Sequence, residues 1–348
     1  MRHSCISHTK RLVAVCAALT LAAAVARDAS AAEIGGIVKA GLWERIQERR
    51  AKRDAAPSSA GSTARHITID GVARDYIIHV PQRVAGVKRP VPTVFVLHGA
   101  KGSAQKAQEL LGFDDVANRE GFVTVYPQGL SNTWNDGRDQ GSRGANSAST
   151  ADDVAFLMAL ASGLVRDGIA DARRLYIAGQ SNGGFMALTM ACTGNSPFAA
   201  FVEVIASTPL GSEQSCRWQM PLPVLLINGS EDPLVRFDGS TGRFGLGGNF
   251  APPALAAYFA KLNDCTSHND RALADLDPRD QSTVIQTVWT GCKAGSAVEL
   301  YTIKGGGHQA PAIRQGHDRW LVEKFLGPRN HDIDTAETAW GFFQRFSR

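Results

Sequence analysis

Short, almost continuously apolar runs alternate with amphipathic stretches over most of this chain. The runs at 91–97 and 223–227 have the composition of strands that are buried on both faces of a parallel sheet. Residues 152–164 repeat apolar side chains at helical spacing on one face. By the same criteria we expect strands at 121–127, 175–179, 199–205 and 298–303, and helices at 104–118, 253–263 and 335–346. The alternation predicts an α/β fold, a single domain with a mostly parallel central sheet flanked by helices.

Polar and glycine-rich positions mark the turns between these elements. Two strand-like runs, 66–69 and 75–80, are separated by Gly71, which favours a hairpin. The stretches 128–150 and 236–252 are rich in glycine and small polar residues, and we expect both to be long loops.

Carboxylates mark the starts of two predicted helices. Asp152 and Asp153 lie in the first turn of one of them, where negative charge is favourable, so a structural role is expected for both. Asp334, with Glu337 three residues later, has the spacing of an N-terminal cap for the last helix.

Residues 1–31 have the pattern of an export signal. Basic residues come first, an apolar run follows over 12–25, and small residues at 29–31 fit a cleavage site. The apolar run is too short for a membrane anchor. We therefore expect a secreted or periplasmic protein without a membrane span.

Residues 32–64 predict a charged leader helix followed by a flexible linker. Charged residues recur four apart over 44–53, as on a solvated helix surface, and 55–62 is rich in Ala, Ser, Pro and Gly. A partner-binding arm is the alternative interpretation. The compact catalytic domain is then expected over 65–348.

The formal charge of the chain is +4. Residues 1–31 contribute three of these positive charges, so the remainder is close to neutral. A neutral domain lacks the basic surface that nucleic acid or an anionic membrane would require, so neither is expected as a partner. Nothing in the sequence predicts the oligomeric state.

Four cysteines follow the predicted signal: Cys192, Cys216, Cys265 and Cys292. In an oxidising compartment an even number of cysteines favours disulfides, and four allow three pairings. We favour Cys192–Cys216 and Cys265–Cys292, because each pair closes a local loop; four reduced thiols are the alternative. The chain has neither Cys-x-x-Cys nor His-Glu-x-x-His, so no metal site is expected.

The stretch 175–188 reads as a strand, a Gly-x-Ser-x-Gly turn and the start of a helix. Ser181 lies at the centre of that turn, between Gly179 and Gly183. This is the context of a nucleophile elbow, in which a strained turn exposes a serine hydroxyl at the end of a sheet. Ser181 is therefore the candidate nucleophile. The alternative is an ordinary glycine-rich turn.

A serine nucleophile needs a base, and the base needs an acid that orients it. In α/β-hydrolases the order along the chain is serine, acid, histidine, each after the end of a strand. Asp232 follows the strand at 223–227, and His308 follows the strand at 298–303. These two residues are the candidate acid and base.

Other residues compete for both roles. Glu231 and Asp238 are alternative acids close to Asp232. His317 is an alternative base in a charged stretch that we expect to be helical, and His98 lies at a strand end but precedes the serine.

An oxyanion requires preorganised backbone donors. The elbow offers the N–H of Asn182, and the loop after the strand at 91–97 offers the N–H of Ala100. His98, in that same loop, is expected to brace it rather than to transfer protons.

Seven motifs occur in one order along the chain: His98-Gly99, Tyr126-Pro127-Gln128-Gly129, Trp134-Asn135, Asp152-Asp153-Val154, Gly179-Gln180-Ser181-Asn182-Gly183-Gly184, Asn228-Gly229-Ser230-Glu231-Asp232 and Gly305-Gly306-Gly307-His308. Over about 65–345 this set resembles the exported esterases that include poly(3-hydroxybutyrate) depolymerases, feruloyl esterases and acetyl xylan esterases. The resemblance implies an α/β-hydrolase fold, a Ser181–His308–Asp232 triad, ester substrates and no metal or cofactor. It also suggests that Trp134 lines the site; a Trp buried in loop packing is the alternative.

Three features depart from the family pattern. Asn228-Gly229 stands where the family often has His-Gly, and Gln309-Ala310-Pro311 lacks an aromatic residue that is common after the histidine. The loop at 236–252 is longer than expected. The missing aromatic residue and the longer loop concern the choice of substrate rather than the triad.

We thus predict an exported serine esterase that cleaves hydroxyalkanoate oligomers, feruloyl esters or acetyl esters through an acyl-enzyme. Soluble oligomers or small esters are favoured, because the sequence shows no separate surface-binding domain. The alternatives are a serine peptidase of the prolyl-oligopeptidase type, an acyltransferase, and a non-catalytic binding protein on a hydrolase scaffold.

Overall fold

The computed structural model describes residues 61–138, 151–212, 216, 221–243, 248–313 and 320–348. The chain divides into two units, Met1–Ser58 and Ser59–Arg348. The predicted export signal at 1–31, the predicted leader helix and His317 lie outside the described residues. The fold and the site both concern the second unit.

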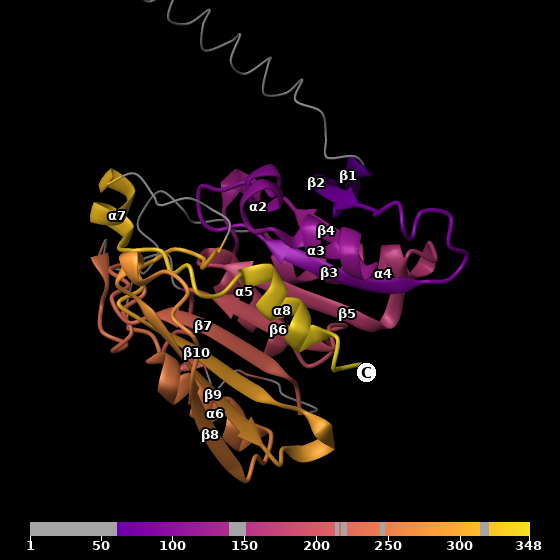
Figure 1. Cartoon of the computed structure of the whole chain (residues 1–348). Helices are drawn as coiled ribbons and strands as arrows, with labels where there is room; N and C mark the ends of the chain where they lie inside the picture. The colour runs from indigo at the N-terminus through magenta and orange to yellow at the C-terminus, as the bar shows by residue number, and fades with distance from the viewer. Residues whose placement is uncertain (1–60, 139–150, 213–215, 217–220, 244–247, 314–319) are drawn as a thin grey trace, which may run out of the picture. The chain divides into compact units, whose positions relative to one another are not determined.

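Ten strands form one sheet (Figure 1). They are β1 Ser62–Ile69, β2 Val72–His79, β3 Val91–Leu97, β4 Val123–Pro127, β5 Ala170–Gln180, β6 Ala200–Val204, β7 Val224–Gly229, β8 Ser267–Ala272, β9 Thr283–Thr290 and β10 Val298–Lys304. Their order is β1-β2-β4-β3-β5-β6-β7-β10-β9-β8. The neighbours from β4 to β10 in that order pair in parallel, and the pairs outside them are antiparallel. The parallel centre was predicted, whereas the antiparallel edge of β8 and β9 was not.

Helices cover both faces of this sheet. They are α2 Ala104–Leu110, α3 Phe113–Glu120, α4 Asp153–Arg166, α5 Asn182–Ala191, α6 Pro252–Leu262, α7 Trp320–Leu326 and α8 Thr335–Phe343, with short 3-10 helices η1 Leu130–Asn132, η5 Pro278–Asp280 and η6 Lys293–Gly295. Apolar side chains of α2, α3 and α8 form one cluster with the sheet. Those of α4, α5 and α6 form two others. The sheet therefore lies between two helical layers, as the apolar strands predict.

One predicted helix is two helices. The sequence predicted a single helix over 104–118, but α2 ends at Leu110 and α3 begins at Phe113. Gly112 between them has φ +72°, a left-handed conformation that interrupts a helix. The N–H of Leu111 still bonds to Ala107, so the first helix closes normally before the chain turns.

Both carboxylates at the start of α4 have structural partners, as expected. Asp152 caps the helix by accepting a hydrogen bond of 2.8 Å from Ala155 N. Asp153 is fully buried and forms an ion pair of 2.5 Å with Arg74 of β2. Its second oxygen accepts from Asn135 N at 2.6 Å. Asp153 thus links α4, β2 and the loop after β4.

The predicted cap of α8 is also present, in altered form. Asp334 accepts hydrogen bonds from the N–H groups of Ala336 and Glu337. The Glu337 side chain turns to Arg119 of α3, with contacts of 2.8 and 2.6 Å. The helix then crosses the sheet over β5 and β6, where Phe343 stacks on Tyr176 at 4.9 Å between ring centroids (Figure 1).

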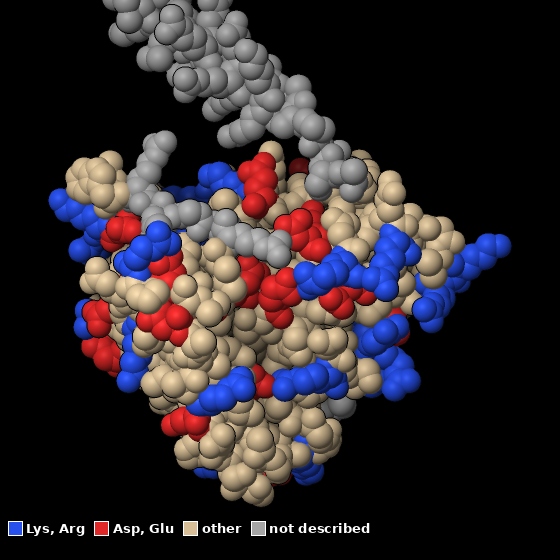
Figure 2. Space-filling view, in the orientation of Figure 1, with Lys and Arg blue, Asp and Glu red and all other residues tan. Residues whose placement is uncertain are grey.

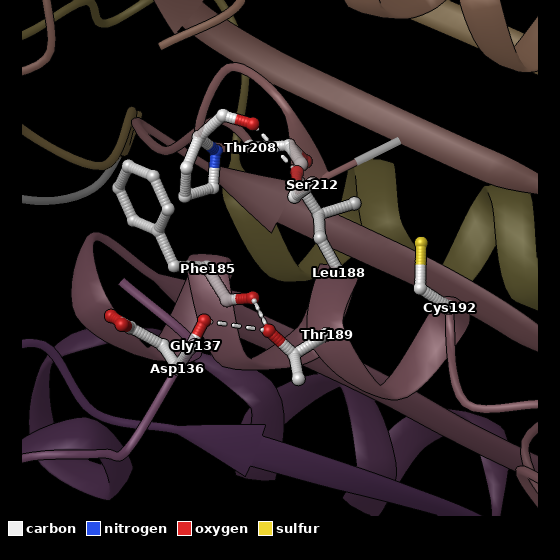
Figure 3. A pocket seen from close by; sticks show the side chains of 9 residues that line it. Asp136, Gly137, Phe185, Leu188, Thr189, Cys192, Thr208 and Ser212 are labelled. Carbon is white, nitrogen blue, oxygen red and sulfur yellow. Dashed lines mark hydrogen bonds between the residues drawn. The ribbon is translucent and has the colours of Figure 1, made fainter. Parts of the chain in front are cut away.

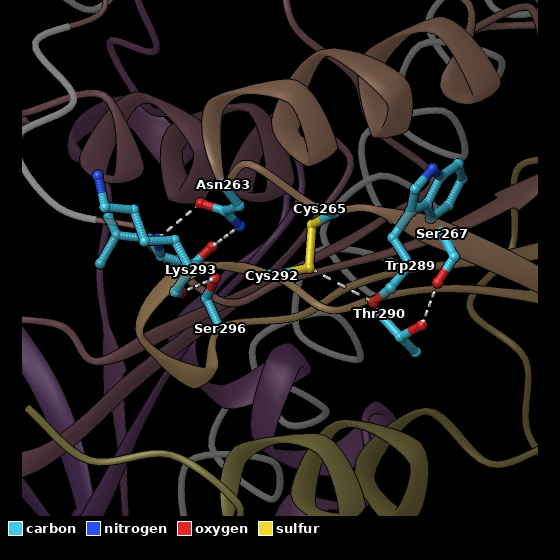
Figure 4. Close-up of a disulfide and its surroundings, with 9 residues drawn as sticks. Asn263, Cys265, Ser267, Trp289, Thr290, Cys292, Lys293 and Ser296 are labelled. Atoms are coloured by element: carbon cyan, nitrogen blue, oxygen red, sulfur yellow. Dashed lines mark hydrogen bonds between the residues drawn. A yellow bond between two sulfur atoms is a disulfide. The ribbon is translucent and has the colours of Figure 1, made fainter.

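Two disulfides join the pairs of cysteines that the sequence favoured, Cys192–Cys216 and Cys265–Cys292. The second connects the end of α6 to the turn after β9 (Figure 4). Asn263 reinforces the same junction, because its carbonyl accepts from Lys293 N at 2.7 Å. The disulfide thus links α6 covalently to the sheet edge formed by β8 and β9, which the sequence did not predict.

The surface of the second unit carries interspersed charges. Figure 2 shows acidic and basic side chains mixed over the face in view. None of the helices within the described ranges is both long and apolar enough to cross a membrane.

Candidate active site

The turn at Ser181 has the strained geometry of an elbow. β5 ends at Gln180 and α5 begins at Asn182, so Ser181 alone makes the turn, with φ +53° and ψ −122°. A side chain at Gly179 would place its Cβ 2.0 Å from the carbonyl oxygen of Gly183. A side chain at Gly183 would approach the carbonyl oxygens of Leu97 and His98 to 2.6 Å. Both glycines are therefore required for the close packing of this turn.

Three side chains from separate loops form one hydrogen-bonded chain. His308 Nε2 lies 2.9 Å from Ser181 Oγ, and His308 Nδ1 lies 2.7 Å from Asp232 Oδ2. Nδ1 donates to the carboxylate, which leaves Nε2 to accept the serine proton. Such an arrangement can serve as a nucleophile, a base and an orienting acid. Ser181 follows β5, Asp232 follows β7 and His308 follows β10, so the carboxyl ends of three parallel strands bring them together.

Backbone groups hold the acid and the base in place. Asp232 Oδ1 accepts from Leu234 N at 2.7 Å and Val235 N at 2.9 Å. His308 N donates to the carbonyl of Leu326 at 2.5 Å. Both side chains are buried, with 2% of Asp232 and 7% of His308 exposed. These donors hold the Asp232 carboxylate aimed at the imidazole.

The two rival acids are both exposed, and Asp238 has another partner. Asp238 is exposed and pairs with Arg236 at 2.9 Å, and this guanidinium holds the pKa of Asp238 below its usual value. Glu231 is exposed, next to the buried Asp232. Of the candidate acids, Asp232 is the one hydrogen-bonded to His308.

The loop after β3 packs against the elbow. A Cβ at Gly99 would lie 3.4 Å from Ser181 Cβ, so the backbone of this loop directly borders the nucleophile. Within the described part of the chain, the N–H groups of Ala100 and Asn182 donate to no other backbone group. The N–H of Asn182 opens a helix, where the first donors have no partner within the helix. Both groups are therefore available as oxyanion donors.

The Asn182 side chain fixes the start of α5. Its Oδ1 accepts from Thr133 Oγ1 at 2.9 Å and Trp134 N at 2.7 Å. Its Nδ2 donates to Trp134 O at 3.1 Å and Asp136 Oδ2 at 2.5 Å. Asp136 is itself paired with Arg138 at 2.5 Å. The first residue after the candidate nucleophile is thus bonded to the loop that follows β4.

Trp134 is buried rather than exposed to a substrate. The sequence offered it as a residue lining the site, but its side chain is fully inaccessible. The indole N–H donates to the carbonyl of His98 at 2.8 Å, and the two rings lie 4.9 Å apart. Its large apolar ring fills the space beneath the loop after β3. The packing alternative is the correct one.

His98 has backbone partners on both ring nitrogens. Nδ1 lies 2.8 Å from Gly99 O, and Nε2 accepts from Gly129 N at 3.0 Å. Burial lowers the pKa of His98. A neutral imidazole that donates through Nδ1 and accepts through Nε2 satisfies both contacts. His98 therefore joins the loop after β3 to the loop after β4.

A cavity of about 120 Å³ lies beside α5 (Figure 3). Phe185, Leu188, Thr189 and Cys192 line it from the helix, facing Asp136, Gly137, Thr208, Pro209 and Ser212. Phe185 is one helical turn after Ser181, and Arg138 lies over its ring at 3.8 Å. The cavity thus runs along α5 from Phe185, one turn after the candidate nucleophile, to Cys192.

Two residues of this region were missed in the sequence. Asp136 lies in a loop of small polar residues, where nothing in the pattern distinguishes it. Glu203 does leave a signal, since it interrupts the apolar run at 199–205 and is fully buried. Among the described residues, no cluster of three or more His, Cys, Asp or Glu side chains could hold a metal ion.

The chain is similar to a family of known esterases. Residues 74–239 match the family model described as esterase PHB depolymerase. The resemblance to this esterase family is confirmed. NocK of Nocardia uniformis subsp. tsuyamanensis, which is named as an esterase, is 27% identical over 85% of this chain and 85% of its own length. Feruloyl esterase B of Piromyces equi is 25% identical over 73% of this chain, which spans 46% of that protein.

A solved structure is similar to this chain in fold. An acetyl xylan esterase from Aspergillus awamori superposes with a TM-score of 0.53 and 13% identity, over 72% of this chain and 95% of its own. At this identity the similarity concerns the fold alone, a mixed sheet between helices. The esterase family and the names of its members support a carboxylic ester hydrolase, as the sequence predicted.

Proposed function

We propose that this chain is an exported serine esterase of the α/β-hydrolase fold that works through an acyl-enzyme. The observation that carries the proposal is the hydrogen-bonded chain from Ser181 Oγ through His308 to Asp232, with distances of 2.9 and 2.7 Å. The elbow conformation of Ser181 adds support, because non-glycine residues at positive φ concentrate at functional sites. The ten-stranded sheet between two helical layers is consistent with the proposed fold.

The first half of the reaction acylates the enzyme. Ser181 Oγ attacks the ester carbonyl carbon while His308 Nε2 takes the hydroxyl proton. Asp232 stabilises the imidazolium that forms, and the N–H groups of Ala100 and Asn182 face the oxyanion. When the tetrahedral intermediate collapses, the bond to the alcohol oxygen breaks and His308 returns the proton to the leaving alcohol.

The second half releases the acid. A water molecule gives a proton to His308 and its oxygen attacks the acyl carbon, in the same geometry. The bond to Ser181 Oγ then breaks, and the proton returns from His308 to the serine. The products are a carboxylic acid and an alcohol, and the enzyme is restored.

The relatives suggest the substrate class. Their names mention feruloyl esters, acetylxylan and poly(3-hydroxyalkanoate). We infer that this chain hydrolyses esters of that range, with soluble oligomers or small esters favoured. Export is supported by the two disulfides, because such bonds persist in oxidising compartments.

The test is a hydrolysis panel with purified residues 32–348. It compares 3-hydroxybutyrate oligomers, methyl ferulate and acetylated xylo-oligosaccharides, with Ser181→Ala as the matched control. We expect at least one ester to be hydrolysed by the wild-type protein and none above background by the variant. If a folded wild-type protein hydrolyses none of them, or the variant is equally active, the esterase proposal is wrong.

A further inference from the structure

A second cavity, a groove of about 460 Å³, lies between α4 and the first half of β5. Its volume is within the range of pockets that hold small molecules, roughly 300–1,000 Å³. The residues that decide its chemistry are Val165 and Arg166 of α4, Ala172 and Leu175 of β5, Pro197 and Arg348. None of the candidate catalytic residues lines it.

The groove is distant from the candidate active site. β5 runs from Ala170 to Gln180, and Ser181 follows its carboxyl end. A strand rises about 3.3 Å per residue, so the Cα atoms of Leu175 and Ser181 are about 20 Å apart. A small molecule in the groove therefore cannot reach the candidate nucleophile, and the groove is a separate site.

Much of the lining is apolar. Leu175 is buried, Val165 and Pro197 are half-buried, and Ala172 is exposed. Contact with an apolar group would remove this surface from water, which is favourable. A ligand that fits the groove therefore has an apolar body.

Two arginines provide the charge of the lining. Arg166 lies in the last turn of α4, and a Cβ on Gly163 would lie 3.6 Å from Arg166 Nη2, so the guanidinium lies back along the helix. Arg348 is fixed beside the start of β5, because its guanidinium donates to Ser196 O and its N–H donates to Arg173 O at 2.9 Å (Figure 1). A guanidinium has five donors, so Arg348 retains others for a ligand.

Neither of these arginines is paired with a carboxylate among the residues that the structure describes. The acid Asp171 pairs instead with Arg174, at 2.8 Å. Asp167, the neighbour of Arg166 in the chain, is exposed and does not line the groove. The described lining thus combines two positive charges with an apolar surface and contains no acidic residue.

We propose that this groove binds an amphipathic monocarboxylate. Its apolar body covers Val165, Leu175 and Pro197, and its carboxylate accepts hydrogen bonds from Arg166 and Arg348. Guanidinium groups bind carboxylates through charge-assisted hydrogen bonds, which matches the charge of the lining. The proposal does not depend on the esterase activity proposed above.

The experiment is calorimetric titration of the wild-type protein with octanoate at neutral pH. Octan-1-ol keeps the apolar chain without the charge, and acetate keeps the charge without the chain. We expect one octanoate to bind per chain, and each matched probe to bind more than about tenfold more weakly. Equal binding of octan-1-ol would show that the arginines take no part, and equal binding of acetate would show that the apolar surface takes none. Either result, or no binding of octanoate, would overturn the proposal.

Variants of the lining locate the bound octanoate. Arg166→Gln and Arg348→Gln should each weaken binding about tenfold, because each removes a charge-assisted hydrogen bond. Ala172→Phe should abolish binding by filling the groove, at an exposed strand position where an aromatic residue is well tolerated. Unchanged binding in all three folded variants would place octanoate elsewhere and overturn the proposal.

The matched control is Arg89→Gln. Arg89 is exposed and does not line the groove, but it lies two residues before Val91, which pairs with Ala170 at the start of β5. The control therefore removes the same charge from the same end of the sheet. We expect it to bind octanoate as the wild type does. A loss equal to that of Arg166→Gln would mean that the net charge of this surface, rather than the groove, attracts the ligand, and would overturn the proposal.

Discussion

The side-chain amide of Asn182 donates a hydrogen bond of 2.5 Å to Asp136 Oδ2. It joins the first residue of α5 to a loop that lies more than forty residues earlier in the chain. Because α5 begins directly after Ser181, this bond determines where the Asn182 N–H points. The oxyanion donor of the proposed mechanism is thus held by its own side chain.

Asn182→Ala should reduce both stability and turnover. It removes four hydrogen bonds and leaves Asp136 without one of its buried donors, which costs about 2–3 kcal/mol. A displaced N–H would lower kcat by about 10²-fold. Thermal unfolding and ester kinetics measure the two effects. Thr133→Val, which removes one of the four bonds, is the graded control and should cost about 1 kcal/mol. Unchanged kcat in a folded Asn182→Ala protein would show that the Asn182 side chain is not needed to position this oxyanion donor.

The two kinds of residue around Asn182 differ in how far the sequence reveals them. Ser181, Asp232 and His308 were predicted because each follows an apolar strand, and the carboxyl ends of parallel strands share one edge of the sheet. Asp136 and Trp134 lie in a loop without periodicity, so their burial depends on tertiary packing that no local pattern encodes. The family resemblance suggested that Trp134 lines the site, with burial in loop packing as the alternative, and the structure places it under His98.

The elements of the fold also differ in how well the sequence predicts them. The central strands contain apolar runs and were predicted, although β5 begins at Ala170, five residues before the predicted start at 175. β8 was missed because all of its side chains are exposed, so it has no apolar face to detect. The break between α2 and α3 depends on the φ of Gly112, which a helical pattern on both sides obscures.

Asp153→Asn should destabilise the protein strongly. The carboxylate is fully buried and pairs with Arg74 at 2.5 Å, so the variant leaves a buried guanidinium without its counter-charge. Burial raises the pKa of Asp153, against the opposing effects of the Asn135 N–H and Arg74. We expect a loss of about 3 kcal/mol in the free energy of unfolding. Chemical denaturation measures it, and the double variant Arg74→Met/Asp153→Leu should recover much of the loss. A loss below 1 kcal/mol for the single variant would show that the pair contributes little.

His98 should make the protein less stable in acid. Burial lowers its pKa, so between that value and about 6.5 the unfolded chain binds a proton that the folded chain does not. Stability is therefore lost as pH falls through this window, by about 1.4 kcal/mol per pH unit. His98→Gln should remove this part of the acid sensitivity. His66→Gln, at an exposed position of β1, is the control. Identical slopes for wild type and His98→Gln would mean that folding does not lower the pKa of His98.

The Cys265–Cys292 disulfide should contribute stability without affecting catalysis. It closes a loop across 27 residues at the edge of the sheet that holds β8 and β9. Replacing both cysteines with serine should lower the free energy of unfolding by about 3 kcal/mol. Ester kinetics at a temperature where the variant is folded should match the wild type. A changed kcat would indicate that this edge influences the candidate site.

The central claim is that Ser181 is a nucleophile activated by His308 and Asp232. Its most direct test is mass spectrometry of the folded protein after reaction with a fluorophosphonate, compared with Ser181→Ala and His308→Gln. We predict one phosphonyl adduct, located on the peptide that contains Ser181, no adduct on Ser181→Ala and much slower labelling of His308→Gln. An unlabelled wild-type protein, or an adduct on another residue that persists in Ser181→Ala, would contradict the account.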